Sequence, residues 1–142
     1  MKTPQPDKRQ AILRTDLINR QQFIDLLIAE FPDIKEVVTD DSWAGLIHLE
    51  MGCFARYTRN AIDNQDRNLV KRCFEFINRI YRNAHPDVEN AIYVSYLEHL
   101  NFEDGHKKRS WALNLMPPLV DRAYKDLIEA LSESERQNEK GR

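Results

Sequence analysis

The sequence predicts an all-α fold: a single domain of five to six helices, arranged as an irregular bundle or as a short α-solenoid-like stack of antiparallel helix pairs. Only 4 of the 142 residues are glycine while 31% are charged, which is typical of helix-rich proteins. Apolar residues recur with helical spacing in several segments, and no useful stretch alternates with period two. We expect residues 1–142 to form one domain, with flexible ends at residues 1–10 and 134–142.

The first clear helix is predicted from Asn19 to about Phe31, where apolar residues recur three and four positions apart. Pro32 ends it, because proline disfavours the helical conformation of the residue before it. A shorter helix is expected around residues 12–18. Residues 33–40 indicate a loop or a short turn before the next helix.

The second helix is predicted from Trp43 to about Asn64, with Asp41 or Ser42 as its N-cap. Its residues are apolar nearly all round, so we expect it to be the central and most buried helix. Small and polar residues form a stripe along it: Gly45, His48, Gly52 and Arg59. We interpret this stripe as a close contact with another helix, and a docking groove is the alternative.

Local signals place the remaining helices. Asp66 is the expected N-cap of a third helix with a clean apolar stripe, and Pro86 occupies the first turn of a fourth helix that ends before Gly105. Residues 110–115 indicate a short helical turn, and the final helix is expected to begin at Pro117–Pro118.

The sequence contains no recognisable catalytic or metal-binding motif. HExxH, GxSxG, GxxxxGK and GxGxxG are missing, and Cys53 and Cys73 lack the paired spacing of a zinc site. We therefore expect no enzyme activity, no cofactor and no metal. Residues 1–10 lack the apolar stretch of a secretory signal, and no segment approaches the roughly 18 apolar residues of a membrane span. We expect a cytoplasmic protein that does not contact a membrane.

Glu50 stands among apolar residues of the second predicted helix, and a buried carboxylate needs a partner. We expect an ion pair with a base of the third helix, such as Arg72 or Arg79. The alternative is a carboxylate that faces a cleft, where it could act with His48 in catalysis.

The segment from Pro86 to Gly105 carries five acidic residues and no Lys or Arg, beside the aromatic residues Tyr93, Tyr96 and Phe102. Carboxylates among aromatic rings are suited to binding a basic protein surface. Full burial of the helix is an equal alternative. Five cations on the third helix suggest nucleic-acid binding, but a pI of about 6.1 and acidic flanking segments argue against it.

Residues 88–104, centred on NAIYVSYLEHLNFED, resemble a stretch of the small all-α immunity proteins of bacterial polymorphic-toxin systems, of the contact-dependent or type VI/Rhs type. The resemblance extends loosely from FPDI at 31–34, through the third helix, to LMPPLVDRAY at 115–124. It implies a cytoplasmic protein that binds a cognate toxin domain and occludes its active site. It transfers no contact residues.

Charge and aromatic chemistry supply the candidate contact residues instead: Glu89, Tyr93, Tyr96, Glu98, Glu103 and Asp104, with Asp40 and Asp41 as a second acidic patch. We expect a 1:1 complex with a toxin that is basic. The alternative function is a non-catalytic helical adaptor or regulatory module, which could be a homo-oligomer that buries the fourth helix.

Overall fold

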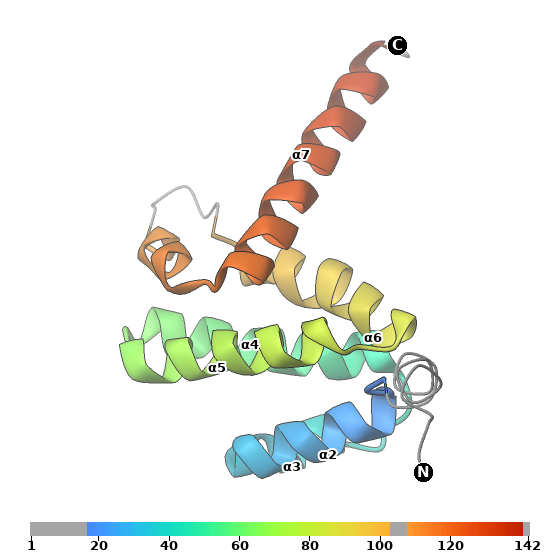
Figure 1. Cartoon of the computed structure of the whole chain (residues 1–142), viewed down its shortest axis with the longest axis vertical. Coiled ribbons are helices and arrows are strands. Elements are labelled where there is room, and N and C mark those ends of the chain that lie inside the picture. Colours follow the sequence, from blue (N-terminus) through green and yellow to red (C-terminus); the bar gives the residue numbers. More distant parts are fainter. Residues whose placement is uncertain (1–16, 103–107, 141–142) are drawn as a thin grey trace, which may run out of the picture.

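The computed structural model describes residues 17–102 and 108–140, and every regular element in these ranges is helical, which confirms the all-α prediction (Figure 1). The α-helices are α2 (Arg20–Glu30), α3 (Lys35–Val38), α4 (Ile47–Asp63), α5 (Arg67–Arg82), α6 (Pro86–Ala91) and α7 (Pro118–Lys140). Four shorter helical elements join them: η1 (Pro32–Ile34), η2 (Ile92–Leu97), η3 (Glu98–Leu100) and η4 (Ser110–Leu115).

Helix α2 has the expected boundaries. The Asn19 side chain accepts a hydrogen bond from the Gln22 amide, and the Gln22 side chain accepts one from the Asn19 amide, which forms a capping box. Pro32 begins a 3₁₀ turn after the helix ends. The shorter helix expected at residues 12–18 lies outside the described residues except at its end, where Ile18 pairs with Ala84 in an isolated parallel bridge.

The predicted start of the second helix is wrong. Helix α4 begins at Ile47, and the residues before it form a turn in which Gly45 has a φ of +90°. The Asp40 carboxylate accepts a hydrogen bond from the Ser42 amide at 2.8 Å, so it stabilises this turn and caps no helix. Residues 33–40, expected as a loop or a short turn, contain the end of η1 and the whole of α3.

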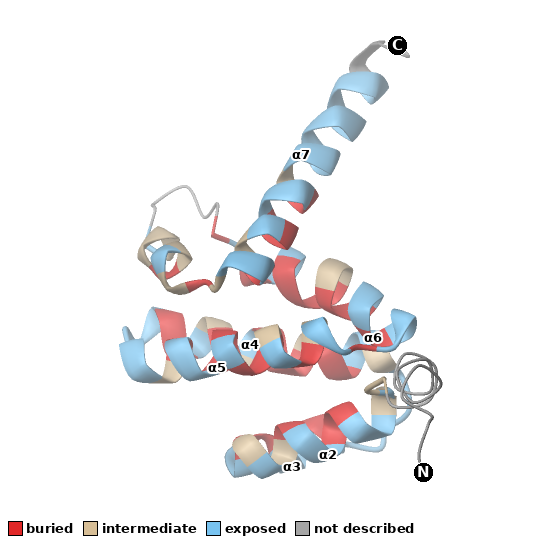
Figure 2. Cartoon of the chain, in the orientation of Figure 1, coloured by how far each residue is buried: buried red, intermediate tan, exposed pale blue. Residues whose placement is uncertain are grey.

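Helix α4 is the centre of the fold, as predicted, because it packs against α3, α5, α6 and η2. It is not buried on every face, however, since the apolar residues Leu46, at its N-cap, and Leu49 are each 52% exposed. Figure 2 shows the buried residues concentrated where α4, α5 and the segment after α6 meet. Aromatic rings fill the centre of this core: Phe23, Phe31, Phe54, Phe76 and Tyr96.

Helix α5 has the N-cap and the apolar stripe that the sequence predicted. The Asp66 carboxylate accepts a hydrogen bond from the Leu69 amide, and the buried residues follow the predicted stripe: Val70, Cys73, Phe74, Ile77 and Ile80. The fourth helix is less regular than predicted, because six residues of α-helix are followed by a π-helix at η2 and a 3₁₀ turn at η3. Asn101 ends it with a φ of 55°, a left-handed conformation that asparagine tolerates.

Helix α7 begins at Pro118, after the short 3₁₀ helix η4 that the sequence predicted. Its first turns bury Val120, Ala123, Tyr124 and Leu127, and the rest projects away from the other helices (Figures 1 and 2). The described part of the expected flexible end continues this helix to Lys140. Along the described ranges, no helix combines the length and the apolar character needed to cross a membrane.

Candidate functional site

A groove of about 310 Å³ lies along one face of α4, between the turn before this helix and the end of the fourth helical segment. The α4 residues that line it recur three or four positions apart, so they share one helix face. The complete lining is Trp43, His48, Leu49, Gly52, Cys53, Arg56, Arg59 and His99.

Gly52 forms part of the groove because no other element packs against it. A Cβ atom at Gly52 would meet no atom within 4 Å, so the glycine is not needed for a close helix contact. Gly52 therefore contradicts the preferred interpretation of the α4 stripe and fits its alternative, a groove, whereas His48 and Arg59 of the same stripe contact Ser95 and His99 of the fourth helical segment. Gly45 does not belong to this helix, since it lies in the preceding turn.

Two histidines form one wall of the groove and are both bound to Ser95 of the π-helix. His48 Nδ1 shares a hydrogen bond with the Ser95 hydroxyl at 2.6 Å, and His99 Nδ1 donates to the Ser95 carbonyl oxygen at 3.0 Å. Ser95 is itself buried. The π-helix thus brings together two imidazoles from distant parts of the sequence, as such elements often do at functional sites.

Three arginines and one carboxylate meet near the other end of the groove. Arg109 donates two hydrogen bonds to the Asp63 carboxylate, at 2.7 and 2.9 Å, and Arg59 donates to the His99 carbonyl oxygen at 2.8 Å. Burial lowers the pKa of Arg59, and the charges of Arg109 and Arg56 lower it further. Arg56 is exposed and has no hydrogen bond or ion pair within the described residues.

Glu50 does not face the groove. Nε and Nη2 of Arg20 each donate to its carboxylate at 2.7 Å, and the Gly45 amide donates at 3.1 Å. The hydrogen bond with Glu50 raises the pKa of Arg20. The expected partners on the third helix were therefore wrong, and both instead contact Glu30, on α2. His48 contacts Ser95 and not Glu50, so the two do not form a catalytic pair.

Tyr96 was wrongly predicted as a contact residue. It is fully buried, its ring stacks on Phe54 with centroids 5.1 Å apart, and its hydroxyl group hydrogen-bonds to Thr58 at 2.9 Å. This burial raises the pKa of Tyr96 well above its usual value. The sequence showed apolar character around the whole fourth helix, so it could not reveal which tyrosine points inward.

The other acidic candidates that the structure describes are accessible. Glu89 and Glu98 are exposed, and neither forms an ion pair with another described residue, while Tyr93 between them is half-buried. Asp40 and Asp41 are exposed in the turn before α4. Glu103 and Asp104 lie outside the described residues.

Two of these carboxylates lie beside the groove. Glu98 directly precedes His99, and the charge of Asp40 contributes to the raised pKa of Cys53, whose main cause is burial. The amide hydrogen bond from Ser42 lowers the pKa of Asp40 itself, so this side chain is firmly anionic at neutral pH. The groove therefore combines apolar, basic and neighbouring acidic side chains.

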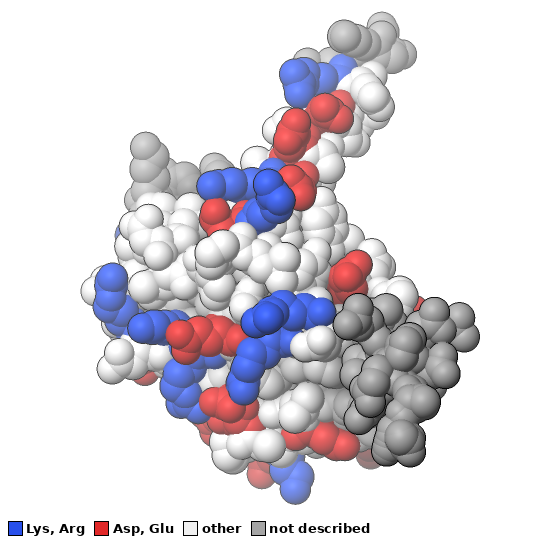
Figure 3. All heavy atoms as spheres, in the orientation of Figure 1, with Lys and Arg blue, Asp and Glu red and all other residues white. Residues whose placement is uncertain are grey.

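Elsewhere, opposite charges are interspersed. Figure 3 shows Lys and Arg next to Asp and Glu over α2 and α5 and on the projecting part of α7. Glu30 lies 3.4 Å from both Arg72 and Arg79, which offsets part of the positive charge on α5. This arrangement weakens the case for nucleic-acid binding by the third predicted helix.

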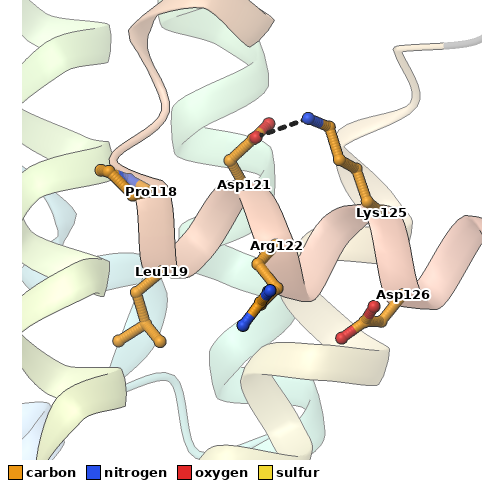
Figure 4. Close-up of a pocket in the computed structure, with 6 residues that line it drawn as sticks. All are labelled: Pro118, Leu119, Asp121, Arg122, Lys125 and Asp126. Carbon is orange, nitrogen blue, oxygen red and sulfur yellow. Dashed lines mark ion pairs between the residues drawn. The ribbon is translucent and has the colours of Figure 1, made fainter.

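A larger hollow, of about 600 Å³, lies beside the start of α7 (Figure 4). All six lining residues come from this one helix: Pro118, Leu119, Asp121, Arg122, Lys125 and Asp126. The Asp121 and Lys125 side chains form an ion pair at 2.9 Å. A hollow lined by a single helix does not bring together functional groups from different elements, so the α4 groove is the stronger candidate site.

Comparison with known proteins identifies a family but no described function. Residues 24–132 match the family model DUF7674, whose description is "domain of unknown function". This range includes every residue that lines the groove. No curated protein and no solved structure matches the chain.

Proposed function

This chain belongs to the DUF7674 family, a domain of unknown function, and we propose that it is a non-catalytic immunity protein. In this proposal it acts in the cytoplasm, binds a cognate bacterial toxin domain in a 1:1 complex and occludes the active site of the toxin. The observation that carries the proposal is a set of exposed, unpaired carboxylates beside a groove with exposed apolar side chains.

The carboxylates differ from the acidic residues that stabilise the fold. Glu30, Glu50 and Asp63 each contact an arginine, whereas Glu89 and Glu98 have no such partner in the described parts of the chain. Their charge is available to attract a basic partner. Such attraction raises association rate constants from about 10⁵–10⁶ to as much as about 10⁸–10⁹ M⁻¹s⁻¹ at low salt.

The apolar residues around the groove supply the second element of a protein interface. Val37, Leu46 and Leu49 are 45%, 52% and 52% exposed, and Trp43 is half-buried among them. A hydrogen bond from Trp43 Nε1 to the Val37 carbonyl oxygen, at 2.8 Å, holds the indole ring in place. Fixed aromatic and aliphatic anchors surrounded by charged residues are typical of interfaces with binding hot spots.

The surface chemistry supports a protein partner, and the sequence resemblance of residues 88–104 supports a toxin as that partner. Two of the carboxylates, Asp40 and Glu98, lie beside the groove, so one convex toxin surface could contact the acidic side chains and the groove together. A toxin with a basic active-site region would match the acidic side chains, and its apolar residues would cover Leu46 and Leu49.

Co-expression with a toxin encoded beside the gene tests the proposal directly. The variant Asp41→Lys, Glu89→Lys, Glu98→Lys should bind that toxin at least about tenfold more slowly than the natural chain at low salt, because steering depends on these charges. Protection of the host cell should weaken in parallel. The matched control reverses three exposed carboxylates of α7, at Glu129, Glu133 and Glu135, and should keep full protection.

Two results would contradict the proposal. The natural chain could fail to relieve toxicity of any neighbouring toxin, which would remove the immunity function. Alternatively, the two triple variants could lose protection equally, in which case net charge and not this surface would govern binding.

A helical adaptor that forms a homo-oligomer is the second candidate, and α7 is the feature that favours it. This helix projects from the other helices, and Leu119 and Leu131 are 38% and 39% exposed along it (Figure 1). The fourth helical segment no longer favours an oligomer, because its apolar residues are buried within the chain itself. Sedimentation of the purified protein separates the candidates: a dimer lost on Leu131→Glu supports the adaptor, and a monomer supports the 1:1 inhibitor.

A further inference from the structure

The α4 groove contains positive charge that the described residues do not neutralise. Arg56 has neither an ion pair nor a hydrogen bond there, and Arg59 contacts a backbone carbonyl oxygen and no carboxylate. The charge of Asp63 acts on Arg59, but this carboxylate already accepts two hydrogen bonds from Arg109. Arg56 and Arg59 therefore each carry a positive charge that is not paired with a described carboxylate.

The positive charges of these arginines repel one another. Arg59 is half-buried, and both burial and the two neighbouring arginines lower its pKa. A bound anion would relieve this repulsion and would replace the water lost from the guanidinium group. Arginine presents several N–H donors in a plane, which suits oxyanions with two or more oxygen atoms.

The histidine wall adds a further donor. Both imidazoles use Nδ1 to bind Ser95, and no described residue forms a hydrogen bond with Nε2 of either ring. When the Ser95 hydroxyl donates to His48 Nδ1, the neutral His48 ring carries its proton on Nε2 and can donate it. His48 and the two arginines can then offer donors to one ligand in the groove that all three line.

The remaining walls suit an organic body attached to the anion. Trp43 and Leu49 are apolar, and Gly52 has no side chain to fill the groove. The groove volume of about 310 Å³ is that of a small-molecule site. We propose that the α4 groove binds a phosphate monoester, with Arg56 and Arg59 holding the phosphate and with His48 and Trp43 lining the part of the groove that takes its organic group. A phosphate dianion matches two guanidinium groups better than a carboxylate, which carries one charge.

This inference does not rest on the proposed toxin binding, although both use the α4 groove. Asp40 and Glu98 lie outside the groove lining, and their charges work against an anion, so affinity depends on the contacts made by the arginines. A toxin that covers α4 would compete with the phosphate ester for the groove.

Titration with phenyl phosphate, followed by amide chemical shifts and by calorimetry, tests the proposal. We expect saturable binding with shifts along α4 and at His99. Loss of charged hydrogen bonds in the variant Arg56→Gln, Arg59→Gln should reduce affinity by roughly tenfold or more. The control is Arg122→Gln, which removes one positive charge from an exposed position on α7, as the single variant Arg56→Gln does in the groove, and should leave affinity unchanged.

If the double variant does not fold, the single variant Arg56→Gln replaces it in the titration. This change should not disturb folding, because the Arg56 side chain makes no hydrogen bond or ion pair with another described residue. Inorganic phosphate should bind more weakly than phenyl phosphate, since it lacks the group that contacts Trp43, and benzoate should also bind more weakly. The proposal is overturned by absence of binding, by equal loss in the Arg122→Gln control, or by benzoate binding as tightly as phenyl phosphate.

Discussion

The ion pair between Arg20 and Glu50 should contribute strongly to stability, and Arg20→Ala tests this. The change leaves the Glu50 side chain, which is 2% exposed, with the Gly45 amide as its one remaining donor among the described residues. Loss of one partner of a buried ion pair costs about 3–5 kcal/mol. Because the Arg20 side chain is 32% exposed, water can reach the vacated space, and we expect the lower end, about 3 kcal/mol.

Urea unfolding followed by circular dichroism measures this loss, and calorimetry should show a Tm lower by about 10 °C. A double-mutant cycle with Glu50→Gln isolates the pair, because the two changes together should cost less than the sum of the single changes. The control is Arg79→Ala, whose side chain is 63% exposed and lies 3.4 Å from Glu30, with an expected loss below about 1 kcal/mol. Equal losses from Arg20→Ala and Arg79→Ala would refute the reasoning.

Three further predictions follow from buried or paired groups. Tyr96→Phe should lower the free energy of unfolding by about 1 kcal/mol, measured in urea, because one buried hydrogen bond to Thr58 is lost and Thr58 keeps another acceptor. The Arg109 side chain lowers the pKa of Asp63, so the stability from this pair is present at neutral pH and is lost as the pH falls through the folded-state pKa. Asp63→Asn should therefore show a smaller drop in Tm than the natural chain from about pH 5 to about pH 2. Burial raises the pKa of the Cys73 thiol to about 12, so a thiol reagent at about pH 8 should label it only after unfolding, as mass spectrometry would show.

Helix boundaries were predictable wherever a local residue decides them. Asn19 and Asp66 accept hydrogen bonds from nearby amides, and Pro32 ends α2. Pro86 is the first residue of α6, where a backbone N–H would have no acceptor within the helix. The start of α4 was not predictable in this way. It depends on a positive φ at Gly45 and on the contact of that residue with Glu50, which the distant Arg20 completes.

The candidate site was predictable in part. Glu89 and Glu98 are exposed as expected, because a carboxylate without a partner is costly to bury. Tyr96 was not predictable, since a tyrosine can be buried when one other residue bonds its hydroxyl group, and Thr58 lies 38 positions away. The groove residues Trp43, Arg56 and His99 come from separate segments, and no sequence spacing connects them.

The sequence by itself determined that the chain is helical, where most helices begin and end, and which faces are apolar, because these properties depend on residues within a few positions of one another. Tertiary structure decided which tyrosine is buried, which arginine binds Glu50, and that Gly52 of the α4 stripe lines a groove while His48 of the same stripe contacts Ser95. Those outcomes depend on pairs such as Arg20 with Glu50 and His48 with Ser95, whose distance is set only when the helices pack.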